Sequence, residues 1–214
     1  MSYKLVVFDM DGTLADTSEG ILNSHRYAHK MMERPEPTAE ELAGVIGGPL
    51  LQTYQTRFAF SEADAKEAVR QYRQWYAENG IYQAKLYDGM KELLINLKVQ
   101  GFKLGVATLK AERFAKVMLK NMGVFSLFDV IYGVDENDKR TKAELIQLCM
   151  TTIGVNKADT VMIGDSVHDL KGAEEAGVSF IGVSYGFGFN GVSKLENISV
   201  CNTVVELLST INKE

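Results

Sequence analysis

The fold is decided by the stretch YKLVVFDMDGTL at residues 3–14, in which a short apolar run leads directly into two aspartates. The run at residues 3–8 is rich in apolar and β-branched side chains, which is typical of a strand buried on both faces. Asp9 and Asp11 follow where this strand ends, and Gly12 permits a tight turn behind them. Two carboxylates this close repel each other, so they are a poor choice if the turn only has to be soluble. We therefore regard the pair as a candidate functional site. An acidic surface loop is the alternative interpretation.

Four further apolar runs later in the chain also predict strands, and helical patterns separate them. We expect these strands at residues 102–107, 129–132, 160–163 and 178–182. We expect helices at residues 88–101, 112–122, 142–153, 167–176 and 204–211. Glycines close several of these helices, as is common where a helix ends in the left-handed conformation. The alternation of strand and helix predicts an α/β fold, in which helices cover both faces of a parallel sheet.

One stretch, residues 17–85, interrupts this alternation with helical patterns and no convincing strand. Residues 21–32 have a helical pattern, and a longer helix begins at Ser61 and keeps its apolar side chains on a 3.6-residue period. A block of about 70 residues is too long for a simple crossover between two strands. We therefore expect residues 1–16 and 86–214 to form the core, and residues 17–85 to form an inserted, all-helical cap.

The composition of the 214-residue chain is that of an ordinary globular protein, with 46% hydrophobic and 24% charged residues. No apolar run approaches the roughly 20 residues that a membrane-spanning helix needs, and the first residues lack the pattern of a signal peptide. The formal net charge of −5 and the absence of a basic stretch argue against nucleic acid as a partner. We therefore expect a cytoplasmic protein. Cys149 falls within a helical pattern, and we expect it to be a packing residue. No feature of the sequence predicts an oligomeric state.

Polar residues follow two further predicted strands, at the edge where open parallel sheets bind their ligands. Thr108 follows the second strand, where its hydroxyl suits either a phosphoryl oxygen or the N-cap of a helix. Asp165 follows the fourth strand, and Asp169 lies one helical turn further on, so both carboxylates can face one point. An aspartate at the N-terminus of a helix interacts favourably with the helix dipole, and this alone could explain either residue. It explains less well why two aspartates occur together at this edge of the sheet.

Lys142 stands at the start of a predicted helix, where a cation is unfavourable by roughly 0.3–1 kcal/mol. The sequence at residues 141–144, TKAE, has the form of a capping box, which places Lys142 in the first helical turn. A solvated side chain is one interpretation, since Lys139 and Arg140 make the segment basic. A cation at the positive end of a helix beside the active edge of a sheet instead makes an anion site, and we favour this interpretation.

Together these residues resemble the four sequence motifs of the haloacid dehalogenase superfamily. The resemblance extends over essentially the whole chain, and the motif at residues 9–13 is its most specific part. It implies a Rossmann-like core, and the inserted helices resemble the small cap of the branch that contains phosphoglycolate phosphatases. Many relatives carry prolines after the motif lysine, whereas Ala143 follows Lys142 here, which leaves Lys139 as an alternative. The residues that carry the motifs are Asp9, Asp11, Thr108, Lys142, Asp165 and Asp169.

The resemblance implies a phosphatase that attacks a phosphate monoester with Asp9 as the nucleophile. Asp11 would protonate the leaving group and then deprotonate the attacking water. Mg²⁺ would bind to Asp9, to the Asp11 carbonyl and to Asp165, with Asp169 orienting these ligands. The cation would offset the repulsion between the nucleophile and the anionic phosphate. The expected phosphate-binding groups are Thr108, the amide of Leu109 and Lys142.

Other functions found in the superfamily fit the sequence less well. In a dehalogenase the leaving group is a halide, which needs no proton, so such an enzyme would lack the second aspartate of the motif. Asp11 is present here. A hexose-phosphate mutase of this branch would carry a histidine twelve residues after the nucleophile, where Ile21 stands, and it remains the alternative enzyme. A non-catalytic, phosphate-binding regulatory module would be expected to have a broken motif, and none is broken. His25, His29 and His168 are expected at the surface or in helix caps.

The expected partner is a small phosphorylated metabolite, and the sequence does not choose among phosphoglycolate, a nucleotide, pyrophosphate and a sugar phosphate. Selectivity in this branch resides in the cap, and residues 47–50 resemble its substrate loop. We expect Gly47 and Gly48 to let the backbone approach the substrate, with Pro49 stiffening the loop. The cap would open and close as a lid. A segment that only joins two cap helices is the alternative.

Overall fold

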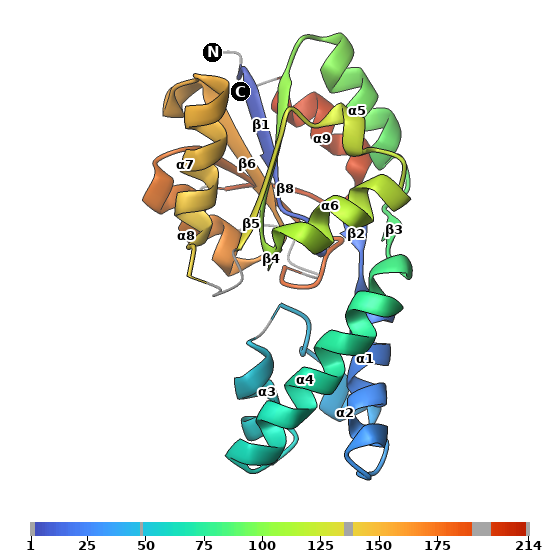
Figure 1. Cartoon of the computed structure of the whole chain (residues 1–214). Helices are drawn as coiled ribbons and strands as arrows, with labels where there is room; N and C mark the ends of the chain where they lie inside the picture. Colours follow the sequence, from blue (N-terminus) through green and yellow to red (C-terminus); the bar gives the residue numbers. More distant parts are fainter. Residues whose placement is uncertain (1–2, 48, 135–138, 190–197, 213–214) are drawn as a thin grey trace. The chain divides into compact units, whose positions relative to one another are not determined.

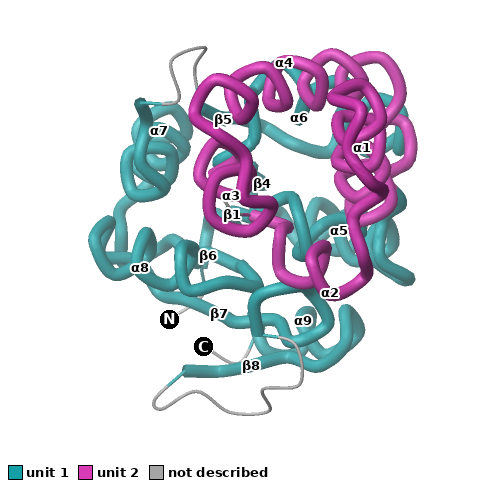
Figure 2. Tube along the Cα trace, turned by 90° about the horizontal axis from the view of Figure 1, so that it is seen from below, with its two compact units in different colours: residues 1–16, 85–214 teal, residues 17–84 magenta. Residues whose placement is uncertain are grey.

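The computed structural model describes residues 3–47, 49–134, 139–189 and 198–212. The chain separates into two compact units, coloured teal and magenta in Figure 2. The first consists of Met1–Asp16 and Lys85–Glu214, and the second of Thr17–Ala84.

A parallel sheet forms the centre of the first unit, as the alternation of strands and helices predicts. Among the described residues it has six strands, in the order β5-β4-β1-β6-β7-β8, and every neighbouring pair is parallel (Figure 1). The sequence did not predict β8, because three residues at the edge of a sheet are too few for a periodic pattern. The strands are β1 (Leu5–Phe8), β4 (Lys103–Ala111), β5 (Val130–Val134), β6 (Thr160–Gly164), β7 (Ser179–Val183) and β8 (Ser199–Cys201).

β1 lies between β4 and β6, and its four residues are all buried. This burial on both faces explains why its sequence is a continuous apolar run and does not alternate. Phe8, the last residue of β1, pairs with Val106 of β4 and with Ile163 of β6. The residues that follow these three strands therefore emerge side by side at one edge, where the chain order reverses and where ligands bind in open α/β sheets.

Helices cover both faces of this sheet (Figure 1). α7 and α8 pack on one face, where Leu5, Val7 and Met162 meet Ile146 and Cys149 in one apolar cluster. Cys149 is fully buried, which confirms its role in packing. α5, α6 and α9 lie on the other face. The helices of this unit are α5 (Met90–Val99), α6 (Glu112–Asn121), α7 (Lys142–Ile153), α8 (Val167–Ala176) and α9 (Val204–Ile211), with the short turns η2 (Phe125–Leu127) and η3 (Lys157–Asp159).

In the second unit, Thr17–Ala84, the described residues form helices and the segments that connect them, and none forms a strand. Ser61 caps the longest of them by accepting a hydrogen bond from the Asp64 amide. An antiparallel pair of two-residue strands, β2 (Ala15–Asp16) and β3 (Lys85–Leu86), borders the unit in the sequence. Lys85, which we expected in the inserted segment, pairs with Asp16. The helices are α1 (Ser18–Met31), α2 (Ala39–Leu42), α3 (Leu50–Thr56), α4 (Glu62–Glu78) and the short η1 (Gly80–Tyr82).

Two histidines of α1 are buried inside this helical unit, so the prediction of surface or capping positions is wrong for them. His25 is fully buried and His29 is 5% exposed. Their Nδ1 atoms lie 3.2 Å from the Tyr54 hydroxyl and 2.9 Å from the Pro35 carbonyl oxygen, respectively. Burial lowers the pKa of His25 to about 3, and the neighbouring His29 adds to this effect. His168, in contrast, is exposed on α8.

No helix in the part of the chain that the structure describes is both long enough and apolar enough to cross a membrane.

Candidate active site

Three buried aspartates converge at the carboxyl edge of the sheet. Asp9 follows β1, Asp165 follows β6, and Asp169 lies in the first turn of α8. Each offers a carboxylate oxygen, and these oxygens all lie within 4.8 Å of one another. Asp169 is held in place by a capping box, in which the Ser166 hydroxyl donates to Asp169 Oδ2 over 2.6 Å. Gly164 lies against the Asp169 side chain so closely that a Cβ at Gly164 would collide with it.

Lys142 brings a buried cation to the same cluster. Thr141 and Glu144 form the predicted capping box, which confirms that α7 begins at Lys142. The Lys142 side chain is 6% exposed, and its Nζ lies 2.7 Å from Asp9 Oδ1 and 2.8 Å from Asp169 Oδ1. It also donates a hydrogen bond to the Ala107 carbonyl oxygen over 2.9 Å. The three protons of the ammonium group thus have three close oxygen neighbours.

The cluster carries more negative charge than the lysine neutralises. Burial, the neighbouring Asp169 and further carboxylates raise the pKa of Asp9 to about 8, against the opposing effect of Lys142. Burial and Asp169 also raise the pKa of Asp165. Burial disfavours the ammonium of Lys142, but Asp169 and Asp9 outweigh it and raise the pKa of Lys142. Three hard oxygen donors beside a single ammonium are a donor set suited to a divalent cation such as Mg²⁺.

Asp11 lies near Asp9, and its carboxylate contacts a second lysine. Its Oδ2 lies 3.1 Å from Nζ of Lys110, a residue that belongs to none of the predicted motifs. Its Oδ1 is buried and has no hydrogen-bond partner among the described residues. Thr13 of the same turn contacts the cluster, since its hydroxyl donates to Asp165 Oδ1 over 3.4 Å.

Thr108 and Leu109, the predicted phosphate-binding residues of β4, lie at this edge but inside the strand. The sequence predicted that the strand ends at residue 107, whereas β4 runs to Ala111. The strand continues because Ala111 resumes pairing with Val134 of β5 beyond an irregularity. Thr108 is 1% exposed, and its hydroxyl oxygen accepts a hydrogen bond from the Lys110 amide over 3.1 Å.

A loop after β7, residues 185–188, contacts Asp165 and was not predicted from the sequence. The amides of Phe187 and Gly188 donate to Asp165 Oδ2 over 2.7 and 3.1 Å. The Tyr185 hydroxyl donates to the carbonyl oxygen of Thr13 over 3.1 Å. The glycine-rich sequence YGFG directly after a strand at the ligand-binding edge is the signal that could have found it.

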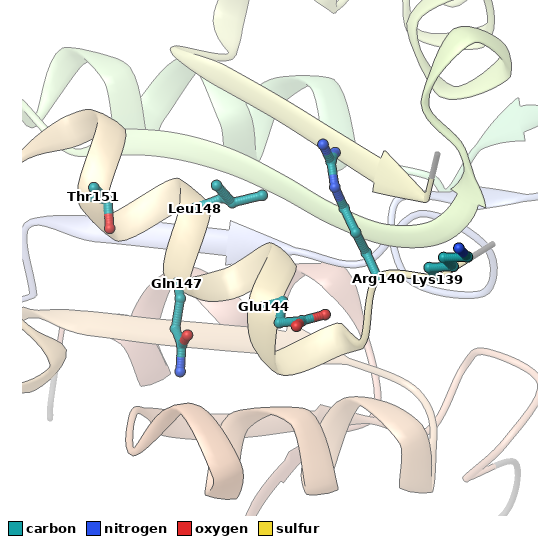
Figure 3. A pocket seen from close by; sticks show the side chains of 6 residues that line it. All are labelled: Lys139, Arg140, Glu144, Gln147, Leu148 and Thr151. Carbon is teal, nitrogen blue, oxygen red and sulfur yellow. The ribbon is translucent and has the colours of Figure 1, made fainter. Parts of the chain in front are cut away.

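Of the other predicted residues, Lys139 belongs to the first unit, and Gly47, Gly48 and Pro49 belong to the second. Lys139, the alternative to Lys142, is exposed and lines an open pocket of about 500 Å³ along α7 (Figure 3). In the second unit, Gly47 has a left-handed backbone with φ of 83°, and Pro49 is the N-cap of α3. Gly48 lies outside the described residues. Of the two candidate lysines, Lys142 is the one that contacts Asp9 and Asp169.

Comparison with known proteins identifies the family. The family model for haloacid dehalogenase-like hydrolases matches residues 6–183. The chain belongs to this family. A 5'-nucleotidase of Pseudomonas aeruginosa is 40% identical to this haloacid dehalogenase-like hydrolase over 189 residues, which cover 88% of this chain and 86% of that protein.

Two further relatives match this haloacid dehalogenase-like hydrolase over different shares of their own length. The tyrosine-protein kinase PtkA of Mycobacterium tuberculosis is 34% identical over 188 residues, which cover 87% of this chain and 64% of that protein. A crystal structure from Clostridium difficile is 35% identical, with a TM-score of 0.91 over 99% of both chains. The predicted family and parallel-sheet fold are confirmed, and the chain is a phosphatase, a phosphoric monoester hydrolase.

Proposed function

We propose that this phosphatase hydrolyses small phosphate monoesters with the help of Mg²⁺, through an aspartyl-phosphate formed on Asp9. The observation that carries the proposal is the position of Asp9, whose Oδ1 lies 2.7 Å from the Lys142 ammonium and within the cluster of three carboxylates. A carboxylate nucleophile divides the hydrolysis of a phosphate ester into two easier steps. It also needs nearby positive charge, because nucleophile and substrate are both anionic.

In this proposal Asp9 attacks phosphorus, and Asp11 gives its proton to the leaving alkoxide. Asp11 then takes a proton from the water that attacks the phosphorus of the aspartyl-phosphate, which restores both carboxyl groups. Lys142, Thr108 and the Leu109 amide bind the phosphoryl oxygens. Lys142 also fixes the orientation of Asp9, as its 2.7 Å contact suggests.

The residues that would hold Mg²⁺ are Asp9, Asp165 and the carbonyl of Asp11, with Asp169 orienting them. The ion would neutralise charge on the nucleophile and on the transferring phosphoryl group. The two amides of the loop at residues 187–188 support this use of Asp165, because they hold its Oδ2.

For the substrate we propose nucleoside 5'-monophosphates first, because of the 40% identity to a 5'-nucleotidase over most of both chains. Phosphoglycolate is the second class, on the resemblance of the motifs and the helical insertion. The segment of Gly47, Gly48 and Pro49 is proposed to choose among substrates, and this role rests on the sequence alone.

Asp9→Asn tests the proposal, because the amide has the shape of the carboxylate but does not attack phosphorus. Turnover of p-nitrophenyl phosphate and of nucleoside 5'-monophosphates is measured with Mg²⁺, and circular dichroism verifies the fold. An acid quench with ³²P-labelled substrate should trap labelled protein from the wild type and none from the variant. Retention of more than about a hundredth of the wild-type kcat would show that Asp9 is not the nucleophile.

A further inference from the structure

Lys110 is an almost buried cation beside Asp11, and neither the motifs nor the proposed mechanism uses it. Its side chain is 8% exposed, that of Asp11 is 21% exposed, and Lys110 Nζ lies 3.1 Å from Asp11 Oδ2. Lysine is rarely buried to this extent, because burying an ammonium is costly unless an anion lies beside it. The pair joins the turn after β1 to β4, across 99 positions of the chain.

A bulge in β4 brings Lys110 to this position. β4 and β5 pair regularly as far as Thr108 and Gly133, and pairing resumes at Ala111 and Val134. Leu109 and Lys110 are thus inserted on β4 with no counterpart on β5. Such bulges occur next to active sites, where they redirect a side chain.

Two local contacts fix the bulge. The Lys110 amide donates to the Thr108 hydroxyl oxygen over 3.1 Å. On the facing strand, a Cβ at Gly133 would lie 2.5 Å from the Lys110 carbonyl oxygen, so the bulge requires a residue without a side chain there. The backbone position of Lys110 therefore depends on the Thr108 hydroxyl and on the glycine of the neighbouring strand.

We propose that Lys110 is a positioning residue that holds the Asp11 carboxyl group in the orientation in which it exchanges protons with the leaving group and with water. The inference rests on the proposed function of Asp11. In the first step, the Asp9–phosphorus bond forms, the bond from phosphorus to the leaving oxygen breaks, and the Asp11 proton goes to that oxygen. In the second step, a water proton goes to Asp11 as the water oxygen bonds to phosphorus and the Asp9–phosphorus bond breaks. Lys110 keeps its own protons throughout.

Because Lys110 acts through Asp11, its importance depends on the leaving group. An alkoxide needs the proton that Asp11 supplies, whereas p-nitrophenolate leaves readily without it. Loss of the Lys110 charge therefore affects the turnover of an alkyl phosphate more than that of p-nitrophenyl phosphate. It leaves KM nearly unchanged, because Asp11 contributes to the chemical step and not to ground-state binding.

The experiment compares Lys110→Met with Lys110→Arg, which keeps a cation, and with Lys116→Met, which removes a partly exposed lysine that pairs with Glu112 on the adjacent α6. We expect Lys110→Met to lower kcat on an alkyl phosphate by ~10–100-fold and on p-nitrophenyl phosphate by less than about threefold. Lys110→Arg should recover part of this loss, and Lys116→Met should behave as the wild type.

A double-mutant cycle with Asp11→Asn decides whether Lys110 acts through Asp11. In the Asp11→Asn background, Lys110→Met should cause no further loss, because the carboxylate that Lys110 positions is gone. An equal loss in both backgrounds, or a raised KM with an unchanged kcat, would show that Lys110 binds the substrate directly and would overturn the inference.

The activities of Lys110→Met and Asp9→Asn distinguish an error in the role of Lys110 from an error in the proposed function. Wild-type kcat on the alkyl phosphate in Lys110→Met, with Asp9→Asn inactive, would refute the role of Lys110 alone. Activity of Asp9→Asn would refute the proposed function as well. Should thermal melts show that Lys110→Met is unfolded, Lys110→Gln takes its place in the same cycle, with the same outcomes.

Discussion

Lys142 Nζ and Asp9 Oδ1 lie 2.7 Å apart inside the protein, although 133 positions separate the two residues in the sequence. Both side chains are close to fully buried, at 6% and 11% exposure. The pair forms because a capping box begins α7 at Lys142, at the edge of the sheet where β1 ends. A buried pair of this kind is costly to break, since the remaining charge has no partner and little water.

Lys142→Met is therefore expected to damage both stability and turnover. Loss of the cation leaves Asp9 among like charges, and breaking a buried ion pair costs about 3–5 kcal/mol. We expect a lower midpoint of unfolding in urea and a kcat/KM reduced by at least ~10²-fold. Lys139→Met is the matched control, because Lys139 is exposed on the surface before α7. Equal losses in the two variants would contradict the assignment of Lys142.

Removal of divalent metal should abolish turnover, and Mg²⁺ should restore it. Ca²⁺ should not replace Mg²⁺, because its larger and looser coordination shell does not enforce octahedral geometry. Stability gives a second readout, since a ligand that binds only the folded state raises the melting temperature. We expect Mg²⁺ to raise the Tm of the wild type and to do so much less in Asp165→Asn. Full activity after exhaustive chelation would show that the carboxylate cluster needs no metal.

The features that the sequence predicted are those with a local cause. The apolar run of β1 continues into Asp9 and Asp11, and the capping box at Thr141 determines where α7 begins. Capping and apolar periodicity involve neighbours in the chain, so a single sequence contains them. Three predicted residues, Asp9, Lys142 and Asp169, meet in the structure because the ends of parallel strands share one edge.

The features that the sequence missed depend on pairing between distant segments. The bulge at Lys110 exists only in relation to β5 and to Gly133. The loop at residues 185–188 is recognisable by its hydrogen bonds to Asp165, which lies more than twenty positions earlier. The burial of His25 results from aromatic side chains of α3 and α4, including Tyr54 and Tyr72, whose contacts no local pattern encodes.

The buried histidines predict that acid destabilises the helical unit. The pKa of His25 is about 3 in the folded protein, because burial and the nearby His29 disfavour its charged form. Burial lowers the pKa of His29 as well. In the unfolded chain both are expected near the ordinary histidine value of about 6.5. Between these values the unfolded chain binds protons that the folded unit does not bind.

The sign follows from that difference in bound protons. A group whose pKa is lowered by folding contributes stability above its unfolded pKa, and this stability is lost as the pH falls towards the folded pKa. The free energy of unfolding should thus decrease as the pH falls below about 6.5, by up to ~1.4 kcal/mol per pH unit for His25, and His29 changes it in the same direction.

Trp75 permits this loss to be measured in the helical unit itself. It is the single tryptophan of the chain, lies on α4 and stacks on Tyr27 at a ring distance of 6.0 Å. Urea unfolding followed by its fluorescence should show a midpoint that drops between pH 7 and pH 5. His25→Gln should flatten this dependence even if the variant is less stable, whereas His168→Gln removes an exposed histidine and should keep the wild-type dependence. A midpoint that stays constant from pH 7 to pH 5, or a His25→Gln variant with the wild-type slope, would show that the unit unfolds in acid for another reason.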